Sequence, residues 1–225
     1  MKPIKVILAD DHTIVREGLR ALLLADGKME VVGEAHNGRE AVALAISLKP
    51  DVVVMDIAMP LLNGLEATKQ LLEALPTVKV LILSAHSDDA YIDRVIAVGA
   101  VGFLIKQTSA QILGKAIHEV MAGNTYYSAQ VSKRVHDHYH AADTPGGLLV
   151  KKATGLTSRE LEVIQLVAEG QANKQVAAEL KISIKTVEKH RQHLMDKLNI
   201  HDTAGLTRYA IGRGIVESSV QVTIV

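Results

Sequence analysis

The chain has 225 residues, which is long for one domain and enough for two domains that each bury a core of their own. It contains no cysteine, which excludes disulfides and thiolate metal sites. No apolar run approaches the ~20 residues that cross a bilayer, and no signal peptide is recognisable at the start. We therefore expect a soluble, cytoplasmic protein without a membrane partner.

The formal net charge is zero, but the charges are not evenly distributed. Residues 1–125 carry 12 Lys and Arg against 15 Asp and Glu, a net charge of −3, whereas residues 126–225 carry 13 against 10, a net charge of +3. The second half is therefore the half that is better suited to bind a polyanion such as DNA.

Short apolar runs alternate with helical patterns through the first half of the chain, which predicts a parallel α/β sheet with helices on both faces. Strands are expected over residues 4–9, 29–33, 52–55, 78–83 and 101–105. Helices are expected over residues 13–24, 38–48, 65–75 and 88–98, and from Ser109 onward. The 3.6-residue period predicts the buried side chains of these helices. They include Ile14, Val15, Leu19, Leu22, Ile46 and Ile112.

Four of the predicted strands end in residues that can carry out chemistry. Asp10 and Asp11 follow the first strand, Asp56 the third, Ser84 the fourth and Lys106 the fifth. A single Asp after a strand is usually a turn former or a helix cap, but the carboxyl ends of parallel strands meet at one edge, where ligands bind. Three carboxylates at that edge require a cation, and oxygen ligands favour a hard ion such as Mg²⁺. With the hydroxyl and the lysine, this set of residues suits phosphoryl transfer.

On these residues, the segment 4–122 resembles the receiver domain of bacterial two-component response regulators. The resemblance implies a flavodoxin-like sheet with strand order 2-1-3-4-5. It implies that Asp56 accepts a phosphoryl group from a sensor histidine kinase, with Mg²⁺ held by Asp10, Asp11 and Asp56. Lys106 and Ser84 would then bind the new phosphoryl oxygens.

Some positions depart from the usual receiver pattern. Gln107 stands where a proline often follows the lysine, so a cis peptide bond is not expected there. The switch pair would be Ser84 and Phe103, an aromatic residue without a hydroxyl. Ala58 and His86 lie two residues after the acceptor and the hydroxyl, where they would flank the attacking water. Ala58 cannot orient water, and His86 could do so only with its ring turned inward and unprotonated, so on balance we expect slow autodephosphorylation.

The receiver is expected to occupy residues 1–123 and a linker residues 124–153, because Thr-Pro-Gly-Gly at 144–147 is the clearest breaker cluster in the chain. A helix over residues 128–140 would carry His136 and His140 on one face, a spacing that can bind Zn²⁺. No acidic or cysteine partner completes such a site, so an exposed linker helix is the simpler interpretation. Residues 216–225 form an apolar tail to which we assign no function.

The second half is predicted to be all helix. Thr157 or Ser158 would cap a first helix, and Asn173 would cap a second one ending at residue 180. Three residues lead into a long helix to about residue 198, and a fourth helix covers 203–212. A helix pair joined in this way, with Lys, Arg and His in its second member, is typical of a DNA-binding helix-turn-helix. A solvated polar face on a helical hairpin remains the alternative.

Residues 154–215 resemble the four-helix DNA-binding domain of LuxR-type regulators. The resemblance rests on Leu-Thr-Ser-Arg-Glu at 156–160 and Lys-Thr-Val-Glu-Lys-His at 185–190. Together the two halves resemble a NarL/FixJ-type response regulator, whose phosphorylation would promote homodimerisation and binding to double-stranded DNA. The residues expected to face DNA are Lys185, Thr186, Glu188, Lys189, Arg191 and Gln192.

Two alternative functions fit parts of this pattern. A hydrolase that works through an aspartyl phosphate is disfavoured because no substrate cap or second general acid is visible in residues 1–122, so we do not expect an enzyme. The other is a phosphate-independent DNA-binding protein that uses the receiver only as a dimerisation platform. A complete set of acidic residues argues against it, and DNA affinity before and after phosphorylation would separate the two.

Overall fold

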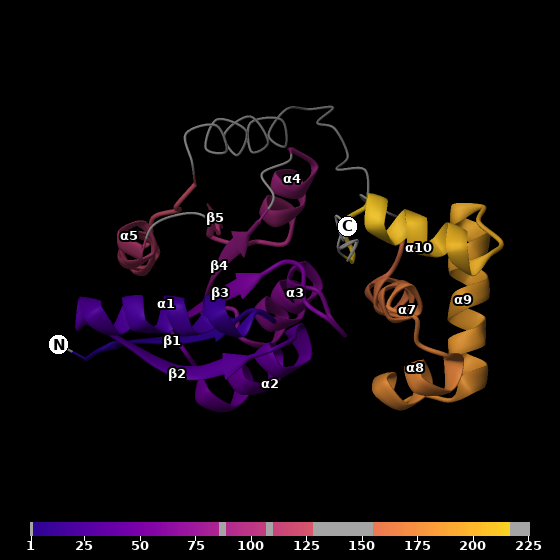
Figure 1. The fold of residues 1–225 in the computed structure, drawn as a ribbon, viewed down its shortest axis with the longest axis horizontal. Coiled ribbons are helices and arrows are strands. Elements are labelled where there is room, and N and C mark those ends of the chain that lie inside the picture. Colours follow the sequence, from indigo (N-terminus) through magenta and orange to yellow (C-terminus); the bar gives the residue numbers. More distant parts are fainter. Residues whose placement is uncertain (1, 86–88, 107–109, 128–154, 217–225) are drawn as a thin grey trace, which may run out of the picture. The chain divides into compact units, whose positions relative to one another are not determined.

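The computed structural model describes residues 2–85, 89–106, 110–127 and 155–216. The chain forms two compact units that divide between residues 154 and 155 (Figure 1). The predicted linker helix with His136 and His140 lies outside the described residues, as do Gln107, His86 and the tail from residue 217 onward. In the described ranges, no helix combines the length and the apolar character that crossing a membrane requires.

The first unit is built on a sheet of five parallel strands. They are β1 (Ile4–Ala9), β2 (Met29–Ala35), β3 (Val52–Asp56), β4 (Lys79–Ser84) and β5 (Gly102–Ile105). Their order is β2-β1-β3-β4-β5, which confirms the flavodoxin-like prediction. This order places the ends of β1 and β3 side by side, at the point where the strand order reverses and a crevice opens.

Helices cover both faces of this sheet. The helices α2 (Gly38–Leu48), α3 (Gly64–Ala74) and α4 (Asp89–Ala97) contribute to one apolar core, and α1 (Thr13–Asp26) and α5 (Ala110–Met121) to the other. Neighbouring residues of a strand point to opposite faces, so Val53 belongs to the first core and Val52 to the second. Strand β3 is buried over its whole length, and it carries Asp56 to the edge of the sheet from a rigid position.

The predicted burial of the helices is wrong at several residues. In α1, Ile14 is 85% exposed and Leu22 is 39% exposed, whereas Arg16 and Leu23 are buried. The helical period groups side chains on one face, but the packing of Leu23 into the core decides which face of α1 turns inward. The other exposed residues that we expected to be buried are Ile46 and Ile112.

The first residues of the predicted linker pack against the sheet. Tyr126 bridges Gly102 in parallel with β5, and its main chain bonds to Val101 and Phe103 at 3.0 Å each. A Cβ at Gly102 would meet Leu81 Cδ1 at 2.3 Å and the Tyr126 carbonyl oxygen at 3.0 Å, so a larger residue here would require these neighbours to shift. The outer edge of β5 is thereby covered rather than left unpaired.

The second unit contains four helices in the part of the chain that the structure describes, which confirms the all-α prediction. They are α7 (Ser158–Ala168), α8 (Asn173–Leu180), α9 (Ile184–Leu198) and α10 (Thr203–Gly212). Helix α9 packs against α7 and α8, and α10 packs against α7. Their core includes Ile164, Leu166, Val176, Val187, Leu194 and Leu206.

The caps of α7 and α8 differ from each other. Thr157 caps α7, and its hydroxyl accepts a hydrogen bond from the Glu160 N–H while the Glu160 carboxylate accepts one from the Thr157 N–H. Asn173, expected as a cap, is instead the first residue of α8, and Ala172 occupies the cap position. The side chain of Gln175 accepts a hydrogen bond from the Ala172 N–H at 2.8 Å, so the cap position needs no polar side chain.

Candidate functional site

The end of the sheet brings the three predicted carboxylates together. Asp10 and Asp11 follow β1, and Asp56 is the last residue of β3. Ligand atoms from these acids and from His12 all lie within 4.8 Å of one another. We call this cluster the acidic pocket. Asp10 and Asp56 are almost fully buried, with exposed fractions of 1% and 3%.

Lys106 closes the acidic pocket from the end of β5. Its Nζ lies 2.8 Å from Asp56 Oδ2 and 2.9 Å from Asp10 Oδ2. The main-chain N–H of Lys106 donates to the carbonyl of Ser84 at 2.7 Å, which connects the residue after β5 to the end of β4. Ser84 is the last residue of β4 and is buried, and Phe103 lies inside the apolar core beside Ile82 of β4.

The loop after β3 orients the Asp56 carboxylate. The N–H of Ile57 donates to Asp56 Oδ1 at 2.8 Å. The N–H of Gly64 donates to the carbonyl of Ile57 at 2.8 Å, and a Cβ at Gly64 would meet the Asp56 carbonyl oxygen at 1.8 Å. Only glycine permits this approach, and Asn63 before it caps α3 by accepting from the Glu66 N–H. The local sequence Asn-Gly therefore holds Asp56 in place.

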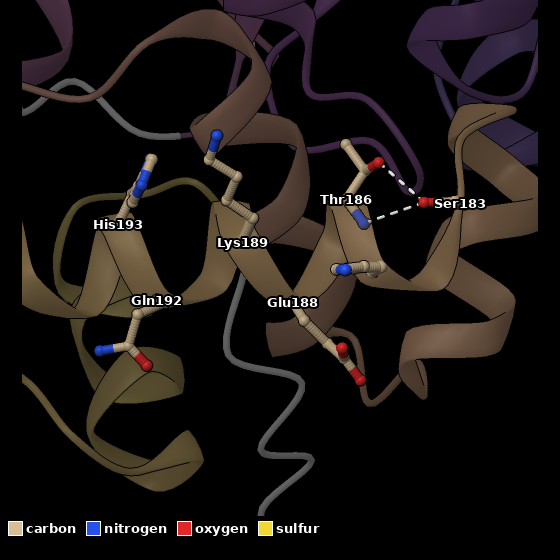
Figure 2. Close-up of a pocket in the computed structure, with 7 residues that line it drawn as sticks. Ser183, Thr186, Glu188, Lys189, Gln192 and His193 are labelled. Carbon is tan, nitrogen blue, oxygen red and sulfur yellow. Dashed lines mark hydrogen bonds between the residues drawn. The ribbon is translucent and has the colours of Figure 1, made fainter.

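Helix α9 presents the predicted DNA-binding residues. The turn 181–183 ends at Ser183, whose hydroxyl accepts from the Thr186 N–H at 3.1 Å and caps the helix. Figure 2 shows Lys189 and His193 on one side of α9 and Glu188 and Gln192 on the other. Together these side chains line a shallow surface groove with three neighbours, which are Ser183, Lys185 and Thr186.

Three of the six predicted DNA-contacting residues form hydrogen bonds within the domain, and one of them, the exposed Gln192, donates to Asp196 Oδ1 at 2.8 Å. Arg191 is half-buried, and it donates to Asn173 Oδ1 at 2.6 Å and to Thr203 Oγ1 at 3.2 Å. Thr186 is half-buried, and its hydroxyl lies 2.8 Å from that of Ser183. The four predicted residues with exposed side chains are Lys185, Glu188, Lys189 and Gln192.

Comparison with known proteins assigns both units. Residues 6–118 match the response regulator receiver domain, and residues 154–210 match the luxR family of bacterial regulatory proteins. The transcriptional regulatory protein DegU of Brevibacillus brevis is 35% identical, over 95% of this chain and 95% of its own. The transcriptional regulatory protein LiaR of Bacillus subtilis is 38% identical, over 92% of this chain and 96% of its own. The chain belongs to the LuxR-family response regulators.

Solved structures agree with this assignment. The RcsB response regulator of Salmonella typhimurium is 26% identical and superposes with a TM-score of 0.62, covering 95% of this chain and 99% of RcsB. The receiver domain of a putative NarL from Mycobacterium tuberculosis is 31% identical with a TM-score of 0.53, covering 55% of this chain and 100% of that domain. This response regulator therefore has a receiver and a LuxR-type DNA-binding domain, and its curated relatives are transcriptional regulators rather than enzymes.

The electrostatics of the acidic pocket depend on burial. Burial raises the pKa of Asp56 from 3.8 to about 7, against the opposing effect of Lys106, and Asp10 and Asp11 add to the rise. Burial alone would lower the pKa of Lys106, but Asp56 and Asp10 outweigh it and the pKa is raised. Lys106 of this response regulator is therefore charged, while the carboxylate of Asp56 is only partly ionised at neutral pH.

The acidic pocket fits a divalent cation, which receiver domains typically bind at this place. Three carboxylates face one ammonium group, so the pocket has an excess of negative charge that a hard cation with oxygen ligands would neutralise. A cation would also stabilise the ionised form of Asp56, which is the nucleophilic form. The ligands available to it are the carboxylate oxygens of Asp10, Asp11 and Asp56.

Two residues beside the acidic pocket of this response regulator were not predicted from the sequence. His12 Nδ1 lies 2.8 Å from Asp11 Oδ1 and 3.1 Å from Asp10 Oδ1. Arg16 is buried behind the pocket, and its Nη1 donates to the main-chain carbonyl of Asp10 at 2.7 Å. The signal that could have indicated Arg16 is a cation spaced one helical turn after His12, at the start of the first helix.

Proposed function

We propose that this response regulator is a transcription factor controlled by phosphorylation of Asp56. A sensor histidine kinase donates the phosphoryl group, and α9 binds double-stranded DNA in the cytoplasm. The observation that carries the proposal is the position of Asp56, which is a buried carboxylate at the end of β3 with Lys106 Nζ 2.8 Å away and two further acids beside it. These contacts support a role for Asp56 as the nucleophile and for Lys106 as the cation that pairs with the phosphoryl oxygens.

Phosphoryl transfer to Asp56 requires an ionised carboxylate. When Mg²⁺ is held by Asp10, Asp11 and Asp56, it supplies charge neutralisation and orientation of the phosphoryl oxygens. An oxygen of Asp56 forms the new bond to phosphorus while the bond from phosphorus to the kinase's histidine nitrogen breaks, and that nitrogen keeps the electron pair. Asp56 Oδ1 is held by the Ile57 N–H and Oδ2 by Lys106, so the carboxylate has a fixed orientation for attack.

The product changes the partners of Lys106 and Ser84. Before phosphorylation, Lys106 pairs with Asp56 and Asp10. The added phosphoryl oxygens offer Lys106 a stronger anionic partner. The hydroxyl of Ser84, one strand away, donates to the same group. When Lys106 and Ser84 turn toward the phosphoryl group, the surface at the ends of β4 and β5 changes, and Phe103 lies in the apolar core nearby. We infer that this change promotes homodimerisation and DNA binding.

DNA recognition is carried by the exposed side chains of α9. Lys185 and Lys189 can bind phosphates or guanine, and Gln192 has the amide geometry that suits adenine. Glu188 can accept from the amino group of cytosine. In a two-fold dimer, two copies of α9 would meet half-sites about one helical turn apart.

Intact-mass spectrometry tests the proposal directly. The full chain is incubated with Mg²⁺ and a small phosphodonor such as phosphoramidate, and wild type should gain one phosphoryl group. The Asp56→Asn variant should gain none, because an amide does not attack phosphorus, whereas Asp93→Asn, at an exposed position on α4, should react like wild type. DNA affinity measured before and after the reaction should rise only for the proteins that react. Equal modification of Asp56→Asn and wild type would refute the assignment of the acceptor.

A further inference from the structure

Arg16 is a buried cation on α1, and the helical period did not predict its burial. The exposed fraction of Arg16 is 3%, although Ile14, two residues earlier on the same helix, is 85% exposed. Burial of a guanidinium group is costly unless its donors are paired. Sequence patterns that fail in this way are expected where a residue serves a site rather than the core. The contacts of Arg16 therefore indicate its role.

Those contacts connect the acidic pocket with the neighbouring strand. Arg16 Nη1 donates to the main-chain carbonyl of Asp10 at 2.7 Å, and Nη2 donates to Thr13 Oγ1 at 3.3 Å. On its other side, Nε lies 3.5 Å from Glu34 Oε2 in β2, which is an ion pair rather than a hydrogen bond. The guanidinium group thus lies between the turn after β1 and the end of β2.

We propose that Arg16 is a positioning residue that orients the acidic pocket for a divalent cation. The proposal rests on the proposed function of that pocket. The carbonyl of Asp10 and the N–H of Asp11 belong to one planar peptide unit. A hydrogen bond to that carbonyl fixes the peptide plane, and with it the directions in which the side chains of Asp10 and Asp11 leave the main chain.

The Asp10 side chain receives a second restraint from the same turn. The N–H of His12 donates to Asp10 Oδ1 at 2.8 Å, which leaves Oδ2 toward Lys106 and Asp56. This arrangement holds only if the turn keeps its conformation. The Ala35 carbonyl accepts from the Asp10 N–H at 3.1 Å, and Arg16 is the buried side chain that binds the Asp10 carbonyl.

Arg20 provides a matched control. It also binds Glu34, with Nη1 3.3 Å from Oε1, but its side chain is 55% exposed and the contacts described for it do not include the turn. Replacing Arg20 by methionine removes an arginine from the same helix and a partner from the same glutamate. Replacing Leu23 by alanine instead weakens the core beneath α1 without touching the turn, and it controls for loss of stability.

The test is the Mg²⁺ affinity of the full chain, measured by isothermal titration calorimetry, with the Mg²⁺ dependence of phosphorylation by phosphoramidate as a second readout. Arg16→Met should raise the Kd for Mg²⁺ about 10-fold or more, as loss of a group that orients metal ligands usually does. Arg16→Lys, which keeps the charge and can still reach the carbonyl, should show a smaller rise. Arg20→Met and Leu23→Ala should keep the wild-type Kd at a temperature where circular dichroism shows them folded.

Two outcomes would overturn the inference. A wild-type Kd in Arg16→Met would show that the turn keeps its orientation without the guanidinium group, and an equal rise in Leu23→Ala would show that lost stability alone explains the effect. If Arg16→Met does not fold, the Kd of Arg16→Lys decides, and an unchanged value there counts against the inference. Wild type that binds Mg²⁺ but accepts no phosphoryl group would refute the proposed function and leave the role of Arg16 standing.

Discussion

Replacing Asp56 by asparagine should stabilise the receiver at neutral pH in the absence of divalent cations. Burial raises the pKa of Asp56 from 3.8 to about 7 in the folded protein, whereas an Asp in an unfolded chain ionises near pH 4. Between these two values the folded state binds more protons than the unfolded state, so the free energy of unfolding falls as the pH rises. Asparagine stays neutral and does not cause this loss.

The magnitude follows from the difference between the two pKa values. A difference of about three pH units corresponds to about 4 kcal/mol, of which roughly 2–3 kcal/mol is lost between pH 5 and pH 8. The free energy of unfolding of Asp56→Asn should therefore exceed that of wild type by a larger margin at pH 8 than at pH 5. Added Mg²⁺ should reduce the margin, because a cation in the acidic pocket stabilises the carboxylate of wild type.

Hydrogen exchange of the β3 amides, followed by mass spectrometry and corrected for intrinsic exchange rates, measures this free energy within the receiver alone. The matched control is Asp93→Asn, which removes an exposed carboxylate from α4 and should follow the pH dependence of wild type. If Asp56→Asn and wild type lose the same free energy between pH 5 and pH 8, burial does not hold Asp56 in its neutral form and the electrostatic argument is wrong.

Three further variants test the DNA-binding helix and the lifetime of the phosphorylated state. Lys189→Ala should weaken DNA binding and reduce the slope of log affinity against log salt by about one, as expected for a lost phosphate contact in mobility-shift assays. Arg191→Met should weaken DNA binding with little change in that slope, because its guanidinium group binds Asn173 and Thr203 within the domain; a slope reduced by about one would instead indicate a phosphate contact. Ala58→Asn should speed the loss of the phosphoryl group after the donor is removed, because an amide can orient water. Decay at the wild-type rate would argue against that role of position 58.

The sequence was most informative where the chemistry lies at the ends of strands. Periodicity and turn residues located the strands, and parallel strands necessarily bring their carboxyl ends to one edge. Asp10, Asp11, Asp56, Ser84 and Lys106 could therefore be selected before any coordinates were known. The helix-turn-helix followed in the same way, because a short turn between two helices and a polar face on the second are local properties.

Tertiary structure alone decided which face of each helix is buried and which polar groups find partners. Ile14 is exposed and Arg16 is buried, because the rotation of α1 depends on how it packs on the sheet and not on its own period. Arg191 has a side chain that is typical of DNA contacts, yet it binds Asn173 and Thr203, which lie 18 and 12 positions away in the chain. Such contacts join segments that the sequence separates, and no local pattern specifies them. The carboxylate, hydroxyl and lysine residues at the strand ends of this response regulator were therefore visible in its sequence, whereas the buried contacts around them, such as those of Arg16, appeared only in the fold.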